Sequence, residues 1–291
     1  MGGPSSVGLA HKICEILNLD LIKIDSKRFP DGEFYFKFVE DIEGEDLLII
    51  QSLYPPQDRH LIELFFLLHT ARNLNAKAIQ LFIPYLAYSR QDRIYMKGEC
   101  LSSALIAETI ESLGVDRLYT VDIHNKEVLK RYRIPTHNLM ASGELAEYFA
   151  KNGIYKPFII SPDDEETAIC RAEIAAKVTN TEYDFFKKHR DRKTGEIVTQ
   201  KKSIPVKGRD VIIIDDIIST GKTSANAAKI LKRQGARRVL VGASHALLNE
   251  GSLDLLKRSG VDSIIGTDCV VNEFSKVSVA PILAKALKKK I

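Results

Sequence analysis

The sequence predicts an α/β protein made of two tandem doubly wound domains with mainly parallel sheets. Short runs rich in β-branched and aromatic residues alternate with longer amphipathic stretches almost from end to end. Several short runs, such as FIIS at 158–161 and VIIID at 211–215, are apolar at consecutive positions. Burial on both faces, as in a parallel sheet covered by helices, explains such runs better than a sheet with one wet face does. The short connections between them favour the same architecture.

The expected elements follow from two periodicities, β-rich runs for strands and apolar residues every three or four positions for helices. In the first half of the chain, strands are predicted at residues 21–25, 34–38, 47–51, 78–84 and 117–122, and helices at 57–74 and 100–113. In the second half, strands are predicted at 157–161, 182–186, 211–215 and 239–243, and helices at 143–151, 165–178, 222–234 and 253–259. A lysine-rich helix is predicted at 277–290.

The pattern is interrupted at residues 135–145, where Pro135, Asn138, Ser142 and Gly143 stand. These residue types favour turns and connections. We therefore expect an N-terminal α/β domain at 1–140 and a C-terminal α/β domain at 141–275. The final segment, 276–291, is expected to pack back on the N-terminal domain as a helix.

Composition and charge restrict the class of protein. The 291 residues carry a formal charge of 42 − 38 = +4, which suits phosphate ligands held by local basic clusters and does not indicate a nucleic-acid partner. Cys14, Cys100, Cys170 and Cys269 are far apart, so reduced thiols are expected, not a zinc site or disulfides. With no secretory leader and no apolar run of about 20 residues, we expect a cytoplasmic protein without a membrane partner.

Two carboxylates and a hydroxyl-rich turn follow a predicted strand in the segment VIIIDDIISTGKTS at 211–224. Asp215 and Asp216 are expected at the strand end, and the turn into the next helix consists of Ser219, Thr220, Gly221, Lys222 and Thr223. Backbone amides at a helix start, with a glycine that permits close approach, suit a phosphate monoester. A Walker A loop would need glycine at position 216, where an aspartate stands. Because carboxylates suit sugar hydroxyls, we expect a sugar-phosphate site here.

Two further segments are informative only in context. Residues 85–93 follow another predicted strand and contain the run SRQDR, whose arginines can hold a polyphosphate in a fixed register. A solvated, salt-bridged loop is the alternative for that run taken alone. The segment RFPDGE at 28–33 by itself predicts a turn.

Polar residues after two other predicted strands are metal candidates. His124 follows the strand at 117–122, and Asp163 follows the strand at 157–161. Magnesium is usually held by one or two carboxylates and substrate phosphates, which suits Asp163 better than an imidazole. Asp164 is an alternative ligand, and the residues leave that choice open. The basic stretch at 187–195 predicts an exposed, mobile loop; a solvated charge run or a nucleic-acid patch are the alternatives.

Taken together, these segments resemble the ribose-phosphate pyrophosphokinase family. RFPDGE, YSRQDR, VDIH, SPD, a K-x-R pair and DDIISTGKT occur in the order found in that family and span residues 28–223. The resemblance implies a phosphoribosyltransferase-like fold and transfer of the diphosphoryl group of Mg-ATP to the C1 hydroxyl of ribose 5-phosphate. The products would be phosphoribosyl diphosphate and AMP. It also implies Mg²⁺ as cofactor.

The resemblance further implies a role for each matching residue. ATP would be bound by Phe29, Asp31, Gly32, Glu33, Arg90, Gln91, Asp92 and His124. Ribose 5-phosphate would be bound by Arg190, Asp215, Asp216, Ser219, Thr220, Gly221, Lys222 and Thr223. His124 and Asp163 would place the metal, and Lys188 and Arg190 would be catalytic, with Lys187 as an alternative to Lys188. The Phe29–Glu33 turn would reach ATP bound by a neighbouring subunit, which implies a homo-oligomer, at least a dimer.

One departure from the family pattern stands after the SPD motif. Asp164, Glu165 and Glu166 occupy positions where the family usually has alanine and two glycines. The competing functions are a phosphoribosyltransferase, a catalytically silent regulatory homologue of the synthetase, and a nucleic-acid-binding protein. A phosphoribosyltransferase would not need the first α/β domain, and the silent homologue would not need Lys188, Arg190, His124 and Asp163.

Overall fold

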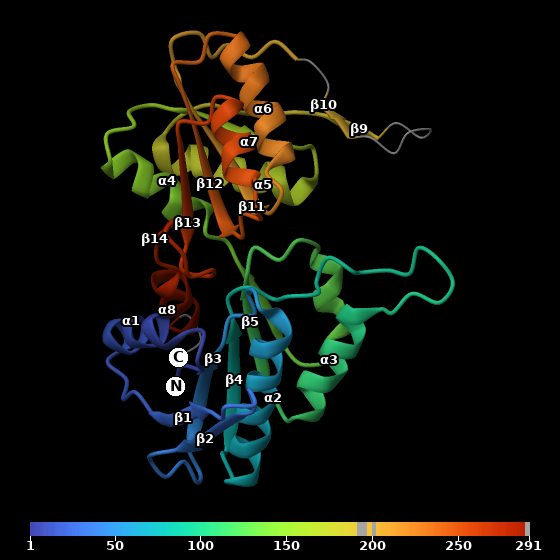
Figure 1. Ribbon diagram of the computed structural model, residues 1–291. Helices are drawn as coiled ribbons and strands as arrows, with labels where there is room; N and C mark the ends of the chain where they lie inside the picture. Colours follow the sequence, from blue (N-terminus) through green and yellow to red (C-terminus); the bar gives the residue numbers. More distant parts are fainter. Residues whose placement is uncertain (191–196, 200–201, 289–291) are drawn as a thin grey trace. The chain divides into compact units, whose positions relative to one another are not determined.

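The computed structural model describes residues 1–190, 197–199 and 202–288, and it divides the chain into two compact units (Figure 1). The N-terminal unit comprises Met1–Leu139 together with Val279–Ile291, and the C-terminal unit comprises Met140–Ser278. The final helix therefore belongs to the first unit although it is last in the sequence.

The N-terminal unit is built around a four-stranded parallel sheet of order β3-β4-β5-β6. The strands of the whole unit are β1 (Ile24–Arg28), β2 (Phe34–Phe38), β3 (Asp46–Ile50), β4 (Ala78–Ile83), β5 (Arg117–Val121) and β6 (Thr136–Leu139). Its helices are α1 (Val7–Leu17), α2 (Gln57–Asn73), α3 (Ser102–Ser112), the 3₁₀ helix η1 (Lys126–Arg131) and α8 (Ala280–Lys288). Apolar residues of α2 at three- and four-residue spacing, Leu64, Leu67, Leu68 and Ala71, are fully buried.

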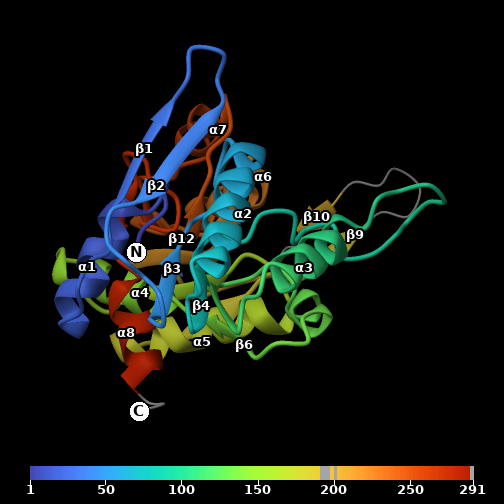
Figure 2. The ribbon, with the colours of Figure 1, turned by 90° about the horizontal axis from the view of Figure 1, so that it is seen from below.

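Two parts of this unit lie outside the central sheet order. Strands β1 and β2 pair with each other as an antiparallel hairpin, from Ile24 opposite Phe38 to Arg28 opposite Phe34 (Figure 2). Helices α1 and α8 pack side by side. The contact joins the two ends of the chain within one unit.

The C-terminal unit contains a six-stranded parallel sheet of order β14-β13-β12-β11-β7-β8. The strands of the whole unit are β7 (Phe158–Ser161), β8 (Tyr183–Phe185), β9 (Lys188–Arg190), β10 (Ile197–Thr199), β11 (Asp210–Ile218), β12 (Arg238–Ala246), β13 (Ser263–Thr267) and β14 (Ser275–Val277). Its helices are α4 (Ser142–Lys151), α5 (Glu166–Thr179), α6 (Lys222–Arg233) and α7 (Ser252–Arg258). The short strands β9 and β10 form a separate antiparallel pair.

Helices cover both faces of this second sheet. On one face, residues of α6 and α7 pack against Val211 and Ile213 of β11. On the other face, residues of α4 and α5 pack against Ile212 and Ile214 of the same strand. Alternate side chains of β11 therefore enter two cores, which explains why its sequence is apolar at consecutive positions. The doubly wound architecture predicted from such runs is confirmed.

Several element boundaries differ from the sequence predictions. Helix α1 and strands β6, β13 and β14 were not predicted, and β1 begins three residues later than expected, at Ile24. The stretch at 135–145, predicted as an interruption, contains β6. The basic stretch at 187–195 was predicted to be a mobile loop, which is wrong for its first part because Lys188–Arg190 pair with Ile197–Thr199. Backbone pairing with another strand decided each of these strands, and for β6 and β13 the partner is distant in sequence.

Candidate functional site

In the C-terminal unit, the predicted polar residues meet at the carboxyl edge of the sheet. Strands β7 and β11 run parallel, with Ile213 opposite Ile160, so the residues after Ser161 lie near the second half of β11. The expectation that β11 ends at Asp215 is wrong: the strand continues to Ile218, and both carboxylates lie within it. Continued pairing with β12, through Ile218 opposite Ala246, keeps this segment extended.

Asp215 and Asp216 form a buried acidic pair, with 6% and 5% of their surfaces exposed. Burial raises the pKa of Asp215 well above its usual range, and the charges of Asp216 and Asp163 raise it further. The guanidinium of Arg171 partly offsets this rise in pKa. Its Nη2 lies 3.6 Å from Oδ1 of Asp216, and only 4% of the Arg171 side chain is exposed. The edge of the sheet therefore holds three carboxylates and one buried cation.

The turn after β11 leads directly into a helix start, as predicted. Gly221 precedes α6 with a φ of 72°, in the left-handed region, and its carbonyl accepts the first helical hydrogen bond from Ala225 at 2.8 Å. Because a Cβ at Gly221 would lie 3.0 Å from Cγ of Leu256, a side chain there would be strained and crowded. The loop after β12 supports the turn, since Asn249 N–H donates to the Ser219 carbonyl at 3.0 Å.

The first amides of α6 have no partner within the helix and no side-chain cap, so they are available to an anion. Around them, Ser219 and Thr223 are half-buried, and Thr220 and Lys222 are exposed. The arrangement offers backbone N–H groups, hydroxyls and an ammonium group to one phosphate. It lies at the end of the same strand that carries the acidic pair.

The departure from the family pattern has a local explanation in this unit. Asp164, Glu165 and Glu166 are exposed, and Glu165 and Glu166 occupy the N-cap and first turn of α5. Negative side chains at a helix N-terminus interact favourably with its dipole. Asp163 stays half-buried, where its Oδ1 accepts a hydrogen bond from Glu165 N–H at 3.3 Å.

In the N-terminal unit, the loop after β4 meets the residue next to His124. Asn125 donates from Nδ2 to Oδ2 of Asp92 at 2.5 Å, and Arg131 donates to the Asp92 carbonyl at 2.5 Å. Ser102 and Ser103 at the start of α3 hold the side chain and the carbonyl of Gln91, each at 2.8 Å. Arg90 is exposed. The structure therefore brings Arg90, Gln91 and Asp92 into the neighbourhood of the half-buried His124.

The Phe29–Glu33 segment forms the tip of the β1–β2 hairpin, as the turn prediction required. Phe29 N–H donates to the Glu33 carbonyl at 2.9 Å, and Gly32 has a φ of 98°. Phe29 is 41% exposed, and Asp31 and Glu33 are also exposed. At the base of this tip, Arg28 pairs with Glu63 of α2.

Lys188 and Arg190 lie on β9, and the residues that connect β9 to β10 fall outside the described part of the chain. Lys187, the alternative to Lys188, is exposed just before this strand.

The donors present suit a magnesium ion that is held largely by substrate and water. Among residues 1–190, 197–199 and 202–288, no group of three or more His, Cys, Asp or Glu side chains is arranged to hold a metal. Asp163 nevertheless presents a half-buried carboxylate beside the acidic pair. Oxygen donors of this kind fit magnesium, which keeps several waters and takes its remaining ligands from phosphates. His124 and Asp163 belong to different units.

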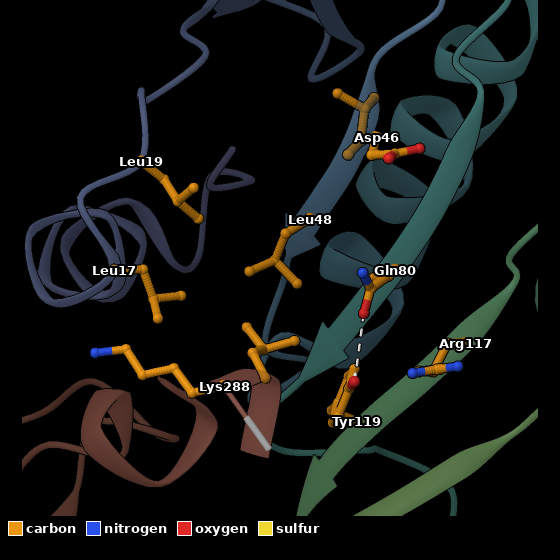
Figure 3. A pocket seen from close by; sticks show the side chains of 10 residues that line it. Leu17, Leu19, Asp46, Leu48, Gln80, Arg117, Tyr119 and Lys288 are labelled. Atoms are coloured by element: carbon orange, nitrogen blue, oxygen red, sulfur yellow. Dashed lines mark hydrogen bonds between the residues drawn. The ribbon is translucent and has the colours of Figure 1, made fainter. Parts of the chain in front are cut away.

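A cavity of about 330 Å³ in the N-terminal unit lies apart from these residues (Figure 3). Its lining includes Asp46, Gln80 and Arg117 near the amino ends of β3, β4 and β5, with Leu17 and Lys288 of α1 and α8. Gln80 and Tyr119 are joined by a hydrogen bond at 3.3 Å across its wall. Because the predicted ATP residues follow the carboxyl ends of the same strands, this cavity is not part of the candidate site.

One residue of the site was missed by the sequence reasoning. Arg171 lies on the buried face of α5, in line with Ala168, Ala172 and Ala175. The signal that could have identified it is an arginine at a position where the helical repeat of α5 otherwise has apolar residues.

No described residues form a helix long and apolar enough to cross a membrane.

Comparisons with known proteins agree with this arrangement. The profile described as the N-terminal domain of ribose phosphate pyrophosphokinase matches residues 1–114, and that of the phosphoribosyl synthetase-associated domain matches residues 192–287. A ribose-phosphate pyrophosphokinase of Sulfurisphaera tokodaii is 37% identical over 100% of this chain and 99% of the relative. That of Saccharolobus solfataricus is 38% identical over 96% of both chains.

A solved structure supports the fold over the same length. The crystal structure of phosphoribosylpyrophosphate synthetase from Mycobacterium smegmatis superposes with a TM-score of 0.83 and 26% sequence identity, covering 99% of this chain and 97% of that one. Full-length similarity above 30% identity, together with the acidic pair and helix start at the sheet edge, establishes the relationship. The chain belongs to the ribose-phosphate pyrophosphokinase family.

Proposed function

We propose that this enzyme transfers the β,γ-diphosphoryl group of Mg-ATP to the C1 hydroxyl of ribose 5-phosphate. The products are phosphoribosyl diphosphate and AMP. The observation that carries the proposal is the juxtaposition of the buried pair Asp215–Asp216 with the helix start at Gly221. Together they offer acceptors for sugar hydroxyls and donors for a phosphate at opposite ends of one short segment.

Ribose 5-phosphate is bound by the C-terminal unit in this proposal. Its 5-phosphate accepts hydrogen bonds from the free amides at the start of α6 and from the hydroxyls of Ser219, Thr220 and Thr223. Lys222 adds positive charge. The vicinal hydroxyls of the ribose donate to Asp215 and Asp216, which fixes the orientation of C1.

ATP is bound by residues of the N-terminal unit. Arg90, exposed after β4, engages the phosphates, while Gln91 is held in place by Ser102 and Ser103. The Asp92 carboxylate is already engaged by Asn125, so its part is to hold the loop beside His124. The exposed hairpin tip, with Phe29, Asp31, Gly32 and Glu33, contacts the adenine bound by a neighbouring subunit, which requires at least a dimer.

His124 and Asp163 are proposed to hold the magnesium ion that accompanies ATP. When bound, the ion neutralises part of the charge of the transferred phosphates. The oxygen of the C1 hydroxyl forms a bond to the β-phosphorus, the bond from that phosphorus to the α,β-bridging oxygen breaks so that AMP leaves with this oxygen, and the proton of the C1 hydroxyl is released to solvent. Lys188 and Arg190 stabilise the negative charge that develops around the transferred group, an effect worth about 10³–10⁵ in rate for related arginines.

The test is a product analysis with purified protein, Mg-ATP and ribose 5-phosphate. AMP and phosphoribosyl diphosphate in equal amounts are expected. ADP would indicate transfer of a single phosphoryl group and overturn the proposal. No turnover would favour the silent homologue, and release of diphosphate only when a nucleobase and phosphoribosyl diphosphate are supplied would favour a phosphoribosyltransferase. That the reaction takes place in the cytoplasm remains a prediction.

A further inference from the structure

The buried acidic pair is accompanied by one buried cation, Arg171. Among residues 1–187 and 202–288, for which side-chain exposure is described, no other lysine or arginine is buried. Arg171 comes from α5, the helix that begins just after the SPD motif, and its Nη2 lies 3.6 Å from Oδ1 of Asp216. Only 4% of the Arg171 side chain and 7% of the Asp216 side chain are exposed. The pair is shielded from water, and charge interactions are stronger in such a buried place than in water.

Two adjacent carboxylates in such a place repel each other. The repulsion between unit charges about 4 Å apart is roughly 4 kcal/mol at an effective dielectric constant of about 20. Burial and the Asp216 charge both raise the pKa of Asp215, while Arg171 lowers it. Arginine suits this position because its guanidinium remains charged when buried, whereas a buried lysine readily loses its proton.

We propose that Arg171 is a positioning residue for the sugar, because its guanidinium holds the Asp216 carboxylate and neutralises part of the charge of the Asp215–Asp216 pair. Both carboxylates can then accept hydrogen bonds from the vicinal hydroxyls of the sugar phosphate. Arg171 itself does not touch the substrate in this arrangement. The inference rests on the proposed binding of ribose 5-phosphate at this edge.

The consequence is specific to the hydroxyl groups of the ligand. Arg171 acts through the carboxylates, so its removal weakens binding only to the extent that the ligand uses them. The 5-phosphate is held by the start of α6, which is a separate part of the site. A sugar phosphate that lacks the 2-hydroxyl already makes one contact fewer with the carboxylates. Its binding affinity should therefore fall less when Arg171 is replaced.

The experiment compares ribose 5-phosphate with 2-deoxyribose 5-phosphate by isothermal titration calorimetry. The unaltered protein is expected to bind ribose 5-phosphate about tenfold more tightly than the deoxy sugar, as a hydrogen bond to a charged group allows. Arg171→Met is expected to reduce this ratio of affinities to near one, chiefly by weakening the binding of ribose 5-phosphate. Arg171→Lys, in which the Asp216 carboxylate favours the protonated amine while burial disfavours it, is expected to restore only part of the ratio and serves if Arg171→Met does not fold.

Lys177→Met is the matched control. Lys177 lies on the same helix and forms an exposed ion pair with Glu173 at 2.7 Å, so its loss should leave both affinities unchanged. An equal loss of affinity for the two sugars in the Arg171 variants would indicate a purely structural role and overturn the inference, as would an unchanged ratio. Failure of the unaltered protein to bind ribose 5-phosphate would instead overturn the proposed function.

Discussion

Arg28 of the β1–β2 hairpin forms an ion pair with Glu63 of α2, a side chain of which only 1% is exposed. The other terminal nitrogen of Arg28 donates to the carbonyl of Gly32 at 2.8 Å, inside the hairpin tip. Arg59 also pairs with Oε1 of Glu63, and Gln51 donates to the other carboxylate oxygen of Glu63, Oε2, at 3.2 Å. A buried glutamate thus connects the turn proposed to contact ATP with the helix that covers the sheet.

Glu63→Gln should destabilise the N-terminal unit and loosen the hairpin tip. We expect the free energy of unfolding to fall by about 2 kcal/mol, less than for a fully buried pair because both arginines still reach water. The KM for ATP should rise severalfold, while the KM for ribose 5-phosphate should not change. Denaturant unfolding and steady-state kinetics measure both effects. Glu173→Gln, which breaks an exposed pair with Lys177, is the control, and equal behaviour of the two variants would contradict the assignment.

Asp215→Asn should weaken binding of ribose 5-phosphate yet stabilise the protein at neutral pH. The folded-state pKa of Asp215 is raised, so ionisation opposes folding once the pH exceeds the unfolded-state value. The variant should therefore melt at a higher temperature than the unaltered protein at pH 7, and this difference should vanish in acid, where both side chains are neutral. Melting curves across pH provide the measurement; a variant less stable at pH 7 would refute this account.

Replacement of Asp210, at the start of β11, should have the opposite effect on stability and destabilise the protein at neutral pH. Its carboxylate accepts hydrogen bonds from Arg237 and Arg238 at 2.6–3.0 Å, which hold its pKa below the usual range. A depressed folded-state pKa contributes stability above the unfolded value and loses it as the pH falls. Asp210→Asn should cost about 1–2 kcal/mol at pH 7, with normal kcat. If the cost persists undiminished in strong acid, the ion pairs are not its cause.

Gly221→Ala should raise the KM for ribose 5-phosphate by about tenfold through displacement of the start of α6. Alanine at a positive φ costs about 1 kcal/mol, and the new Cβ would lie 3.0 Å from Leu256. Gly208→Ala is a matched control, since Gly208 has the same φ of 72° with no atom within 4 Å of the added Cβ. The control should lose stability from the positive φ alone, with an unchanged KM; a raised KM in both variants would rule out a local effect at the phosphate turn.

Lys188→Ala should lower kcat by orders of magnitude with little change in melting temperature, because the residue is proposed to act only on the developing charge. Lys187→Ala tests the alternative placement of this role. Activity is measured as AMP formation from Mg-ATP and ribose 5-phosphate. Unchanged turnover in Lys188→Ala, with loss in Lys187→Ala, would shift the catalytic assignment by one residue.

Much of the candidate site was predictable because its residues are local in sequence. Asp215 to Thr223 occupy one segment, and any residue that follows a parallel strand must lie at the carboxyl edge of the sheet. The apolar run at 211–214 likewise predicted a strand buried on two faces, which the cores around α5 and α6 confirm. Local periodicity and motif spacing were sufficient for these elements.

Relations between distant residues were decided only by the tertiary structure. Arg171 meets Asp216, Arg28 meets Glu63, and α8 packs against α1, a helix that was not predicted; nothing in the intervening sequence specifies these contacts. Pairing with β12 also carried β11 past Asp215, so that both carboxylates became buried. The amino-acid sequence by itself determined the class of fold and the chemistry available at the sheet edge. Burial and charge pairing depend on which surfaces pack together, and that is a property of the folded chain as a whole.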